Sequence, residues 1–475
     1  DYNVVADAML EDYYGLDKWF KPEVNLKLNI KPIPGLNYQQ VVGYENRQWE
    51  LHQYWPSTHR SEIDNSRKGH AHLAFSKTEN LTSEGYFSYV KDFKGGHNLN
   101  ATAGYSYFEV NGENFGMDNY NFSVDGIKYW DIGQGSYLTD GKAGMSSGKS
   151  VTERLFSFFA RANYSYQDKY MLSASIRHEG SSKFAADNRW ANFWSATAGW
   201  RISNEEFMKD FDWLDDLKIR FGYGVTGNND FSATYMANML GSDTNWMMPN
   251  GTWAYSYGKS QNVNPNLGWE EKKEWNLGVD YSFFEGRLYG KFDYYRREVD
   301  NLLFSVKVPQ PPYTQGSQMQ NIGSMESKGW EFEVGGDIIR TKDFTWSSSM
   351  NLSHNTGKIL TLEGDNSYHN GNGFVAPGTP GDAARMEAGS TIGSFYMWKF
   401  AGFDDEGSFL LYNKDGEVIP AAQKTENDKQ YIGNYTPKLI IGWSHTLTYK
   451  NFDLGINLRS WIDFDVYNTC LLYTS

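Results

Sequence analysis

Apolar and polar residues alternate with a period of two along much of the chain. Every second residue from Trp275 to Phe283 is apolar, and the residues between them are small or polar. Successive side chains of a β-strand point to opposite faces, so this alternation predicts a strand with one apolar and one wet face. The pattern restarts at Leu288 after the turn 284–287, which predicts a hairpin.

The same unit recurs, and we count about fourteen strands in seven short-linked pairs. The predicted pairs are 24–33 with 36–44, 81–90 with 99–107, 156–166 with 170–176, 194–202 with 217–225, 275–283 with 288–294, 330–338 with 344–352, and 439–449 with 452–458. We expect consecutive antiparallel hairpins in one curved sheet. The expected register places Trp275, Leu277, Val279 and Tyr281 outward and Asp280 inward.

The length of the connections alternates as well. Short links are predicted at 34–35, 94–97, 167–169, 284–287, 342–343 and 450–451, and the intermediate, acidic link 203–216 has room for one helical turn. Long polar stretches separate the pairs, at 44–80, 111–152, 227–274, 299–328 and 360–437. Short periplasmic turns at one rim and long extracellular loops at the other are typical of an all-β transmembrane antiparallel β-barrel of the outer-membrane kind.

Aromatic and charged residues agree with this architecture. Aromatic residues flank the short turns, where an interfacial girdle is expected: Tyr164, Tyr166, Tyr170, Phe283, Tyr449 and Phe452. The alternative is that they cap the core of a soluble sheet. Many charged residues share the inward phase: Arg161, Arg177, Arg201, Lys218, Arg220, Asp280, Lys291, Asp293, Glu331, Glu333, Asp337, Asp453 and Arg459. A dry core would not hold so many ions, so this face must be hydrated or covered by polar protein, as in a wide barrel.

Composition narrows the class further. The 475 residues carry 44 Lys and Arg against 58 Asp and Glu, a net charge of −14, which argues against nucleic acid as the main partner. The 47 Gly and the many aromatic residues favour strands over a helical bundle. No apolar stretch approaches the length of a transmembrane helix. The single Cys470 excludes a disulfide framework within the chain, and the start at Asp1 without a leader is expected of a cut end.

Several segments resemble the barrel of SusC-like (SusC/RagA) TonB-dependent outer-membrane transporters. The longest is 160–208, ARANYSYQDKYMLSASIRHEGSSKFAADNRWANFWSATAGWRISNEEFM. Further matches are IRFGYGVTGNND at 219–230, NPNLGWEEKKEWNLGVDYSFFEGRLYGKFDYYRREVDNLLF at 264–304, NIGSMESKGWEFEVGG at 321–336 and GSFYMWKFAGF at 393–403. Their order follows the family and covers most of the chain from Thr152 onward.

The resemblance implies a fold and an activity. The family forms a 22-stranded barrel with an N-terminal plug in its lumen, preceded by a TonB box and usually a small extra domain. It implies import of oligosaccharides, or sometimes peptides, across the outer membrane of a Gram-negative, Bacteroidetes-like bacterium. A SusD-like lipoprotein serves as the lid and the TonB–ExbB–ExbD complex as the energy source.

The same resemblance sets the expected domain organisation. Neither a plug nor a TonB box is recognisable, so residues 1–469 are expected to be a partial barrel of about fourteen of the 22 strands. An open sheet in lipid leaves backbone groups unpaired, so we expect no transport from this fragment alone.

No catalytic, cofactor-binding or metal-binding constellation stands out, and we expect no enzymatic activity. The nine His are scattered without an HExxH motif, and a GxSxG elbow is missing. Two combinations suggest metal ligands, His70 with His72 and His178 with Glu179, although solvated loop histidines are far commoner.

Two loop segments are candidates for binding. The segment Asn413–Ile419 lies where many family members carry a loop that resembles a calcium site. Lys414 and Val418 interrupt its series of possible oxygen ligands, so an ordinary polar turn is favoured. Four aromatic residues in 227–274 would suit sugar stacking, loop packing or lid docking: Trp246, Trp253, Tyr255 and Tyr257. None is singled out as a substrate ligand, and the substrate stays unassigned.

Alternatives to the transporter remain at this point: a passive porin or adhesin barrel, or a secreted β-rich carbohydrate-binding or hydrolytic protein. The last residues, Cys470–Ser475, read CLLYTS, which is the translation of TGTCTCTTATACACATCT, a transposase adapter end used in sequencing libraries. We therefore expect residues 470–475 to be a non-native tail; the alternative is a genuine loop.

Overall fold

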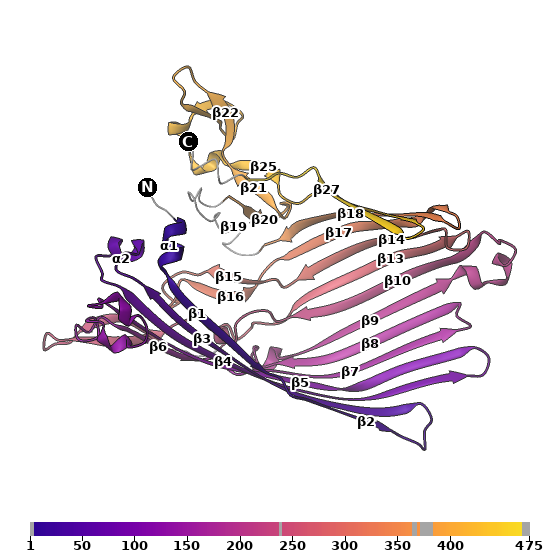
Figure 1. Ribbon diagram of the computed structural model, residues 1–475, viewed down its shortest axis with the longest axis horizontal. Coiled ribbons are helices and arrows are strands. Elements are labelled where there is room, and N and C mark those ends of the chain that lie inside the picture. Colours follow the sequence, from indigo (N-terminus) through magenta and orange to yellow (C-terminus); the bar gives the residue numbers. More distant parts are fainter. Residues whose placement is uncertain (1–3, 237–239, 363–367, 371–382, 468–475) are drawn as a thin grey trace.

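The computed structural model describes residues 4–236, 240–362, 368–370 and 383–467. It contains one large antiparallel β-sheet in which each strand pairs with the next along a single path. The strands of that path are β1 (Asp12–Phe20), β3 (Leu36–Trp55), β4 (His70–Phe93), β5 (His97–Tyr120), β7 (Glu153–Tyr166), β8 (Tyr170–Ser181), β9 (Trp190–Arg201), β10 (Leu214–Asn228), β13 (Glu270–Phe283), β14 (Leu288–Asp300), β17 (Ser324–Arg340), β18 (Phe344–Thr361), β26 (Leu439–Tyr449) and β27 (Phe452–Ile462). Figure 1 shows these strands side by side around a curved wall, with β1 and β27 at its two sides.

The remaining elements lie beside this path or in its connections. The strands β2 (Glu23–Asn29) and β6 (Gly144–Lys149) pair with β3 and β5. The small sheets consist of β11 (Leu240–Met247) with β12 (Trp253–Lys259), β15 (Leu303–Lys307) with β16 (Ser317–Asn321), β19 (Tyr368–Asn370) with β20 (Arg385–Glu387), β21 (Ser394–Met397) with β25 (Gln430–Asn434), and β22 (Lys399–Phe403) with β23 (Phe409–Tyr412) and β24 (Val418–Pro420). The helices are α1 (Val4–Leu10), α2 (Arg60–Asp64) and the 3-10 turns η1 (Asp125–Ile127), η2 (Ile132–Gln134), η3 (Ala186–Asn188), η4 (Ile202–Asn204), η5 (Glu206–Met208), η6 (Ala233–Met236), η7 (Ala421–Gln423) and η8 (Glu426–Asp428). No helix in these ranges is long and apolar enough to cross a membrane.

All seven predicted hairpins are confirmed, and their turns explain the tight links. The first predicted pair matches β2 and β3, and each of the other six matches two neighbouring strands of the path. Gln167 and Asp168 have φ of 51° and 55°, and Phe284 and Glu285 have φ of 61° and 59°. Two successive left-handed residues match the twist of the flanking strands and close a hairpin tightly. The intermediate link contains η4 and η5, in agreement with the expected helical turn.

The predicted long loops are shorter than expected, because the strands continue into them. The strands β3, β4 and β5 have 20, 24 and 24 residues, and the first loop spans 56–69 instead of 44–80. The strand β1 was missed altogether. Where these extensions begin, the outer face is polar as well: the Tyr44 hydroxyl donates to Glu79, and Lys77 pairs with Glu79 and Glu113. A strand that is wet on both sides shows no alternation of polarity, so its sequence predicts a loop.

The register separates two faces of the sheet, as predicted. Leu277 on β13 lies opposite Phe221 on β10 and Tyr294 on β14, whereas Asp280 lies opposite Lys218 and Lys291. We call the side of Leu277 the apolar face and the side of Asp280 the polar face. Following the register from β7 to β27 places all thirteen charged residues of the predicted inward set on the polar face.

The apolar face is exposed. Leu277 is 43% exposed, Phe221 50% and Leu172 56%. The buried clusters of the described residues lie instead around Phe184 and Trp269 and around Tyr54 and Phe122. A sheet of a soluble protein would bury such a face against a second layer, so the surroundings of this face must themselves be apolar.

Candidate functional site

An apolar band crosses the apolar face. On β13 it runs from Trp275 to Phe283, nine residues, and ends where Lys273 pairs with Asp300 at 2.7 Å. On the neighbouring strands it ends at Arg296, whose Nε lies 2.6 Å from Glu326. About nine to eleven residues are needed for a β-strand to cross the hydrocarbon core of a bilayer. The band therefore has the height of a membrane.

Aromatic side chains edge this band at both ends. All six residues predicted for the girdle lie on the apolar face: Tyr164, Tyr166, Tyr170, Phe283, Tyr449 and Phe452. Tyr166 and Tyr170 stack beside a short turn, with ring centroids 6.5 Å apart. The opposite end has its own aromatic pair, Trp275 and Tyr294, with centroids 5.4 Å apart. Amphipathic rings favour the two interfaces of a membrane, and the second edge was not predicted.

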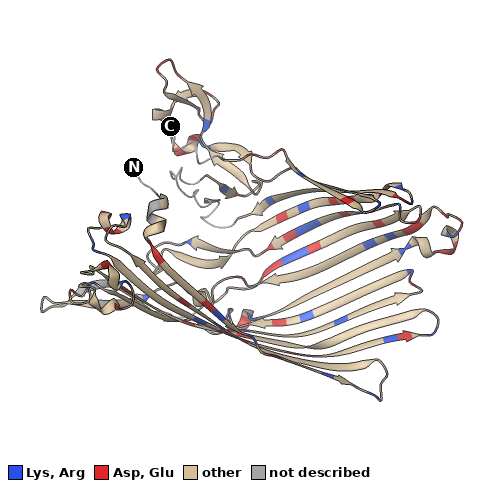
Figure 2. Cartoon of the chain, viewed as in Figure 1, with Lys and Arg blue, Asp and Glu red and all other residues tan. Residues whose placement is uncertain are grey.

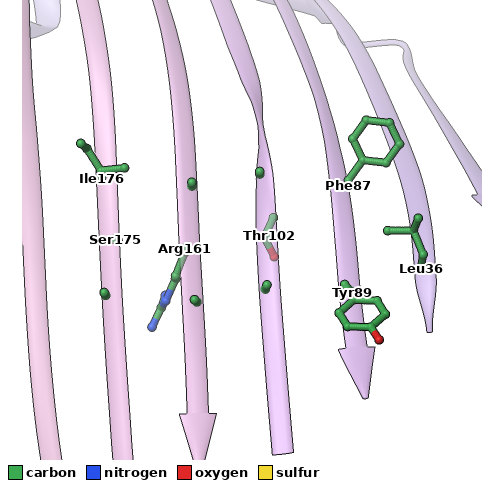
Figure 3. A pocket seen from close by; sticks show the side chains of 12 residues that line it. Leu36, Phe87, Tyr89, Thr102, Arg161, Ser175 and Ile176 are labelled. Atoms are coloured by element: carbon green, nitrogen blue, oxygen red, sulfur yellow. The ribbon is translucent and has the colours of Figure 1, made fainter. Parts of the chain in front are cut away.

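A shallow hollow interrupts the apolar face. Its floor consists of alanines on three neighbouring strands: Ala101, Ala103, Ala160, Ala162 and Ala174. Figure 3 shows Leu36, Phe87 and Tyr89 on one side and Ile176 on the other, which enclose about 470 Å³. Because its side chains on this face are almost all apolar, the hollow offers few partners to a sugar or a peptide, and it belongs to the surface that faces hydrocarbon.

Charged residues form rows across the polar face. One row runs over five adjacent strands, each residue directly opposite the next: Arg201, Lys218, Asp280, Lys291 and Glu333. Opposite signs meet at Lys218 and Asp280, at Asp280 and Lys291, and at Lys291 and Glu333, where the last pair is 3.1 Å apart. Figure 2 shows Lys, Arg, Asp and Glu along β10, β13, β14 and β17 and not only in the connections. Cross-strand pairs of opposite charge stabilise a sheet only modestly, but they keep this wall hydrophilic.

Arg220 is the centre of the tightest charge cluster. Its Nε donates to Asp280 Oδ2 at 2.7 Å, and its Nη2 donates to Asp280 Oδ1 at 2.8 Å. Nη2 also lies 3.3 Å from both carboxylate oxygens of Asp293, one strand farther along. The side chains of Arg220, Asp280 and Asp293 are 32%, 30% and 16% exposed. This bidentate, half-buried arrangement fixes the guanidinium in one orientation.

The cluster depends on a glycine between its members. Gly278 lies directly opposite Arg220 on one side and Asp293 on the other. A Cβ at this position would lie 2.7 Å from Arg220 Cζ and 2.6 Å from Asp293 Oδ1. Only glycine lets the guanidinium pass over the strand that separates β10 from β14.

A hollow with a mixed lining lies beside Arg220. It encloses about 440 Å³, and small residues such as Gly199 and Gly222 line it together with side chains of the apolar face, among them Leu172 and Phe221. Lys218 and Arg220 border it, and amide and hydroxyl side chains contribute to its wall: Asn98, Asn163, Asn276, Ser165, Ser173 and Thr197. Such a lining can hydrogen-bond a polyhydroxylated or peptidic solute, or a polar segment of protein.

Of the two histidine combinations singled out from the sequence, only one converges in the structure. His70 Nε2 and His72 Nδ1 both lie 2.8 Å from Asp118 Oδ1, at the long-connection end of the polar face. His178 and Glu179 lie on opposite faces and do not converge. Within the described ranges, three or more His, Cys, Asp or Glu side chains nowhere form a group that could hold a metal ion.

The convergence of His70 and His72 belongs to an aromatic stack that sequence reasoning missed. The His70 ring lies between Trp55 and Tyr120, with centroid distances of 4.5 and 4.2 Å. The Arg67 guanidinium also lies over the Tyr120 ring, 4.5 Å from its centroid. These residues come from three strands and a loop, and only the register brings them together.

The candidate calcium segment forms the turn between β23 and β24. The Asn413 side-chain oxygen accepts hydrogen bonds from the backbone of Asp415 and Glu417, and Gly416 has a φ of 83°. The Asp428 carboxylate accepts from the backbone of Lys414. These contacts are those of a side-chain-stabilised hairpin turn, and they use the Asn413 oxygen that would otherwise face a cation.

Three of the four loop aromatics singled out above lie on β12, and Trp246 lies on β11. Trp253 is 65% exposed and Tyr257 71%. The side chains of Trp246 and Tyr255 lie outside the described part. Exposed rings on a hairpin at the long-connection rim are available for contacts, but their position alone does not identify the ligand.

Residues 11–467 match the family described as TonB dependent receptor-like, beta-barrel. The chain belongs to this TonB-dependent receptor family. Its exposed apolar face is therefore the outer surface of a barrel wall, and the polar face is the lumenal surface. The family is one of receptors and not of enzymes, in line with the expectation of a non-enzymatic protein.

Curated relatives of the chain include SusC. The chain is 34% identical over 340 residues to the TonB-dependent receptor SusC of Bacteroides thetaiotaomicron, covering 69% of this chain and 33% of that protein. It is 31% identical over 465 residues to TonB-dependent receptor P3 of Formosa agariphila, covering 93% and 44%. The chain thus spans between a third and a half of the length of these relatives.

A solved structure supports the fold. The RagAB peptide transporter superposes with a TM-score of 0.80 at 24% identity, over 95% of this chain and 48% of that one. At this level of identity the likeness establishes the barrel architecture alone.

Proposed function

We propose that this chain is part of an outer-membrane active transporter that imports an oligosaccharide or, second in order, a peptide. Import is driven by the TonB–ExbB–ExbD complex and gated by a SusD-like lipoprotein lid. The short-turn rim faces the periplasm and the long-connection rim faces the cell exterior. The host is a Gram-negative bacterium of the Bacteroidetes kind.

The observation that carries this proposal is the contrast between the two faces of one wall. The outer face has an apolar band nine residues high on β13, which suits lipid. The inner face carries the Arg220 cluster and the charged row beside it, which suits water and a polar solute. Both are properties of a wide barrel that lets polar compounds cross an apolar membrane.

Similar proteins support the proposed mode of transport. SusC is a TonB-dependent receptor by name, and RagAB is a peptide transporter by title. Partnership with a lipoprotein, coupling to TonB and the class of solute are carried over from that likeness. The relatives contain regions that lie outside the part matched by this chain. We propose that the full-length protein contains corresponding regions.

The test uses the gene of the full-length protein that contains this chain. Its deletion is expected to abolish growth on at least one complex glycan or peptide mixture as sole carbon source, and complementation restores growth. Deletion of TonB is expected to give the same defect. Unchanged growth on every glycan and peptide that the host uses overturns the proposal.

The same strains separate the alternatives. Solute flux that continues without TonB favours a passive porin. Release of the protein into the medium without detergent favours a secreted carbohydrate-binding protein.

A further inference from the structure

A small sheet in the connection between β18 and β26 has one apolar face. In this sheet, formed by β22, β23 and β24, Phe400 lies opposite Leu411, and Leu411 lies opposite Ile419. Phe403 lies opposite Phe409, after a register shift between Phe400 and Gly402. Directly opposite residues share a face, so apolar side chains gather on one side of the sheet. We call this side the phenylalanine face.

The phenylalanine face is exposed. Phe400, Phe403 and Phe409 are 51%, 60% and 53% exposed, although their rings contact one another with centroids 5.1 to 5.9 Å apart. A three-stranded sheet normally packs its apolar side against another layer. Three clustered phenylalanines in water are unfavourable, which is why contiguous apolar patches mark interaction sites.

Membrane lipid does not cover this face. The sheet belongs to the connection that leaves β18 at Thr361, and the apolar band of the neighbouring β17 ends near Trp330, where Lys328 and Glu326 follow on the same face. Figure 1 shows β22 projecting away from the ends of β17 and β18. The phenylalanine face therefore lies at the long-connection rim, outside the band that matches a bilayer.

Acidic residues occupy both turns of the sheet that carries the phenylalanine face. The turn between β22 and β23 contains Asp404, Asp405 and Glu406, and the next turn contains Asp415 and Glu417. Within the described residues, none of these five carboxylates forms a salt bridge of 4.0 Å or less. Residues 399–420 also contain Lys399 and Lys414, so their net charge is 2 − 5 = −3. An apolar centre with an acidic rim is complementary to an apolar patch bordered by Lys and Arg.

We propose that the phenylalanine face docks the lipoprotein lid, through a patch on the lid that has an apolar centre and a basic rim. This inference rests on the proposed function, which supplies the partner. Phe400, Phe403 and Phe409 provide the contact energy, as clustered aromatic residues do in protein interfaces. The five carboxylates orient the lid and accelerate its association.

Other occupants fit the same surface less well. A second copy of the chain would bring its own acidic rim against this one, and an anionic membrane surface would be repelled in the same way. A protein patch with an apolar centre and a basic rim is complementary both to the phenylalanines and to the acidic residues of the two turns.

The experiment uses the full-length transporter, co-expressed with the SusD-like lipoprotein of the same host and purified in detergent. The affinity of the separated proteins is then measured by biolayer interferometry. The triple variant Phe400→Ser/Phe403→Ser/Phe409→Ser is expected to bind the lipoprotein roughly tenfold or more weakly. Val418→Ser is the matched control, because Val418 is 54% exposed on the opposite face of the same small sheet and should leave the affinity unchanged.

A second variant keeps the test valid if the triple variant assembles poorly. Asp404→Lys/Asp405→Lys/Glu406→Lys leaves the apolar centre intact and is expected to slow association, and to remove the decrease of the wild-type association rate with added salt. Wild-type affinity in the triple variant, or an unchanged rate and salt dependence in the charge variant, overturns the docking site while the transporter function stands. Wild-type protein that fails to bind the lipoprotein overturns both. A change confined to self-association of the transporter assigns the face to a second copy and overturns the lid.

Discussion

Arg220 and Asp293 are joined across a strand that separates them. Their side chains lie on β10 and β14, and the Arg220 guanidinium passes over Gly278 of β13 to come within 3.3 Å of the Asp293 carboxylate. On the way it forms a bidentate pair with Asp280. Three strands of the lumenal wall are thus linked by one side chain, and the link requires a position without a Cβ.

The substitution Gly278→Ala is expected to push the Arg220 guanidinium away from Asp293. The added Cβ would lie 2.6 to 2.7 Å from both partners, but Arg220 can move because the contact is with the end of its flexible side chain. We expect a loss of about 0.5–1.5 kcal/mol in the free energy of unfolding of the full-length barrel in lipid vesicles. Gly199→Ala is the control, since its Cβ would meet Lys218 and Met171 at an ordinary 3.5 Å. Equal effects of the two substitutions would contradict the packing described for Gly278.

The two partners of Arg220 are expected to differ in strength. Double-mutant cycles with Arg220→Met should give a larger coupling energy to Asp280→Asn than to Asp293→Asn, because only Asp280 is held by two short hydrogen bonds. The side chains of Arg220 and Asp280 are about a third exposed, so solvent screens their pair, and we expect about 1–2 kcal/mol for Asp280 and less for the longer contact with Asp293. Urea titrations of the single and double variants in vesicles measure both values. A reversed order would show that the guanidinium prefers Asp293.

The membrane-facing register can be tested with two adjacent positions of β13. Leu277→Lys introduces a charge inside the apolar band, between its middle and one edge, and is expected to cost about 1–3 kcal/mol of unfolding free energy. Asn276→Lys places the same side chain on the polar face, one residue away, and should cost less than about 1 kcal/mol. The unfolding of both variants in vesicles, with the yield of folded protein in the outer membrane as a second readout, checks the assignment. Comparable losses for the two variants would be incompatible with a two-faced wall.

The sequence predicts those parts of the fold that follow from local alternation. The hairpins and the opposite faces of Leu277 and Asp280 were predictable because one side of each strand contacts lipid and the other contacts water, so apolar and polar residues alternate. The extensions of β3, β4 and β5 were not, since Glu79 and Lys77 on the outer face are as polar as their neighbours. The polarity signal disappears where the strand leaves the membrane.

Contacts between distant residues could not be predicted in the same way. The polar character of Arg220, Asp280 and Asp293 was evident, but the choice of partners depends on register and on the space above Gly278. The His70 stack and the phenylalanine face likewise depend on strand pairing inside segments that read as loops. Phe400, Phe403 and Phe409 belong to short strands of four or five residues, which are too brief to show a period.

Acidification is expected to loosen the small loop sheet through Asp428. This carboxylate caps η8 by accepting from the Thr425 hydroxyl at 2.7 Å and from the Thr425 backbone at 2.8 Å, and it also accepts from the Lys414 backbone. The hydrogen bonds from Thr425 hold the pKa of Asp428 below its ordinary value. A carboxyl whose pKa is lowered on folding contributes stability above the ordinary aspartate pKa of about 3.9, and this contribution is lost as the pH falls through the lowered value.

Hydrogen exchange of the full-length protein, followed by mass spectrometry and corrected for intrinsic exchange rates, measures this effect. Protection of the peptides that contain Lys414 and Thr425 is expected to be constant near neutral pH and to decrease as the pH falls below about 4. Asp428→Asn has the same shape without the charge, so its protection should already be reduced at neutral pH and should show a smaller pH dependence. Asp415→Asn is the control, because Asp415 lies in the neighbouring turn and its side chain does not accept a hydrogen bond from Thr425 or Lys414. If Asp428→Asn and the wild type lose protection in parallel, another acidic group is responsible, and the cap at Thr425 does not control the stability of this loop.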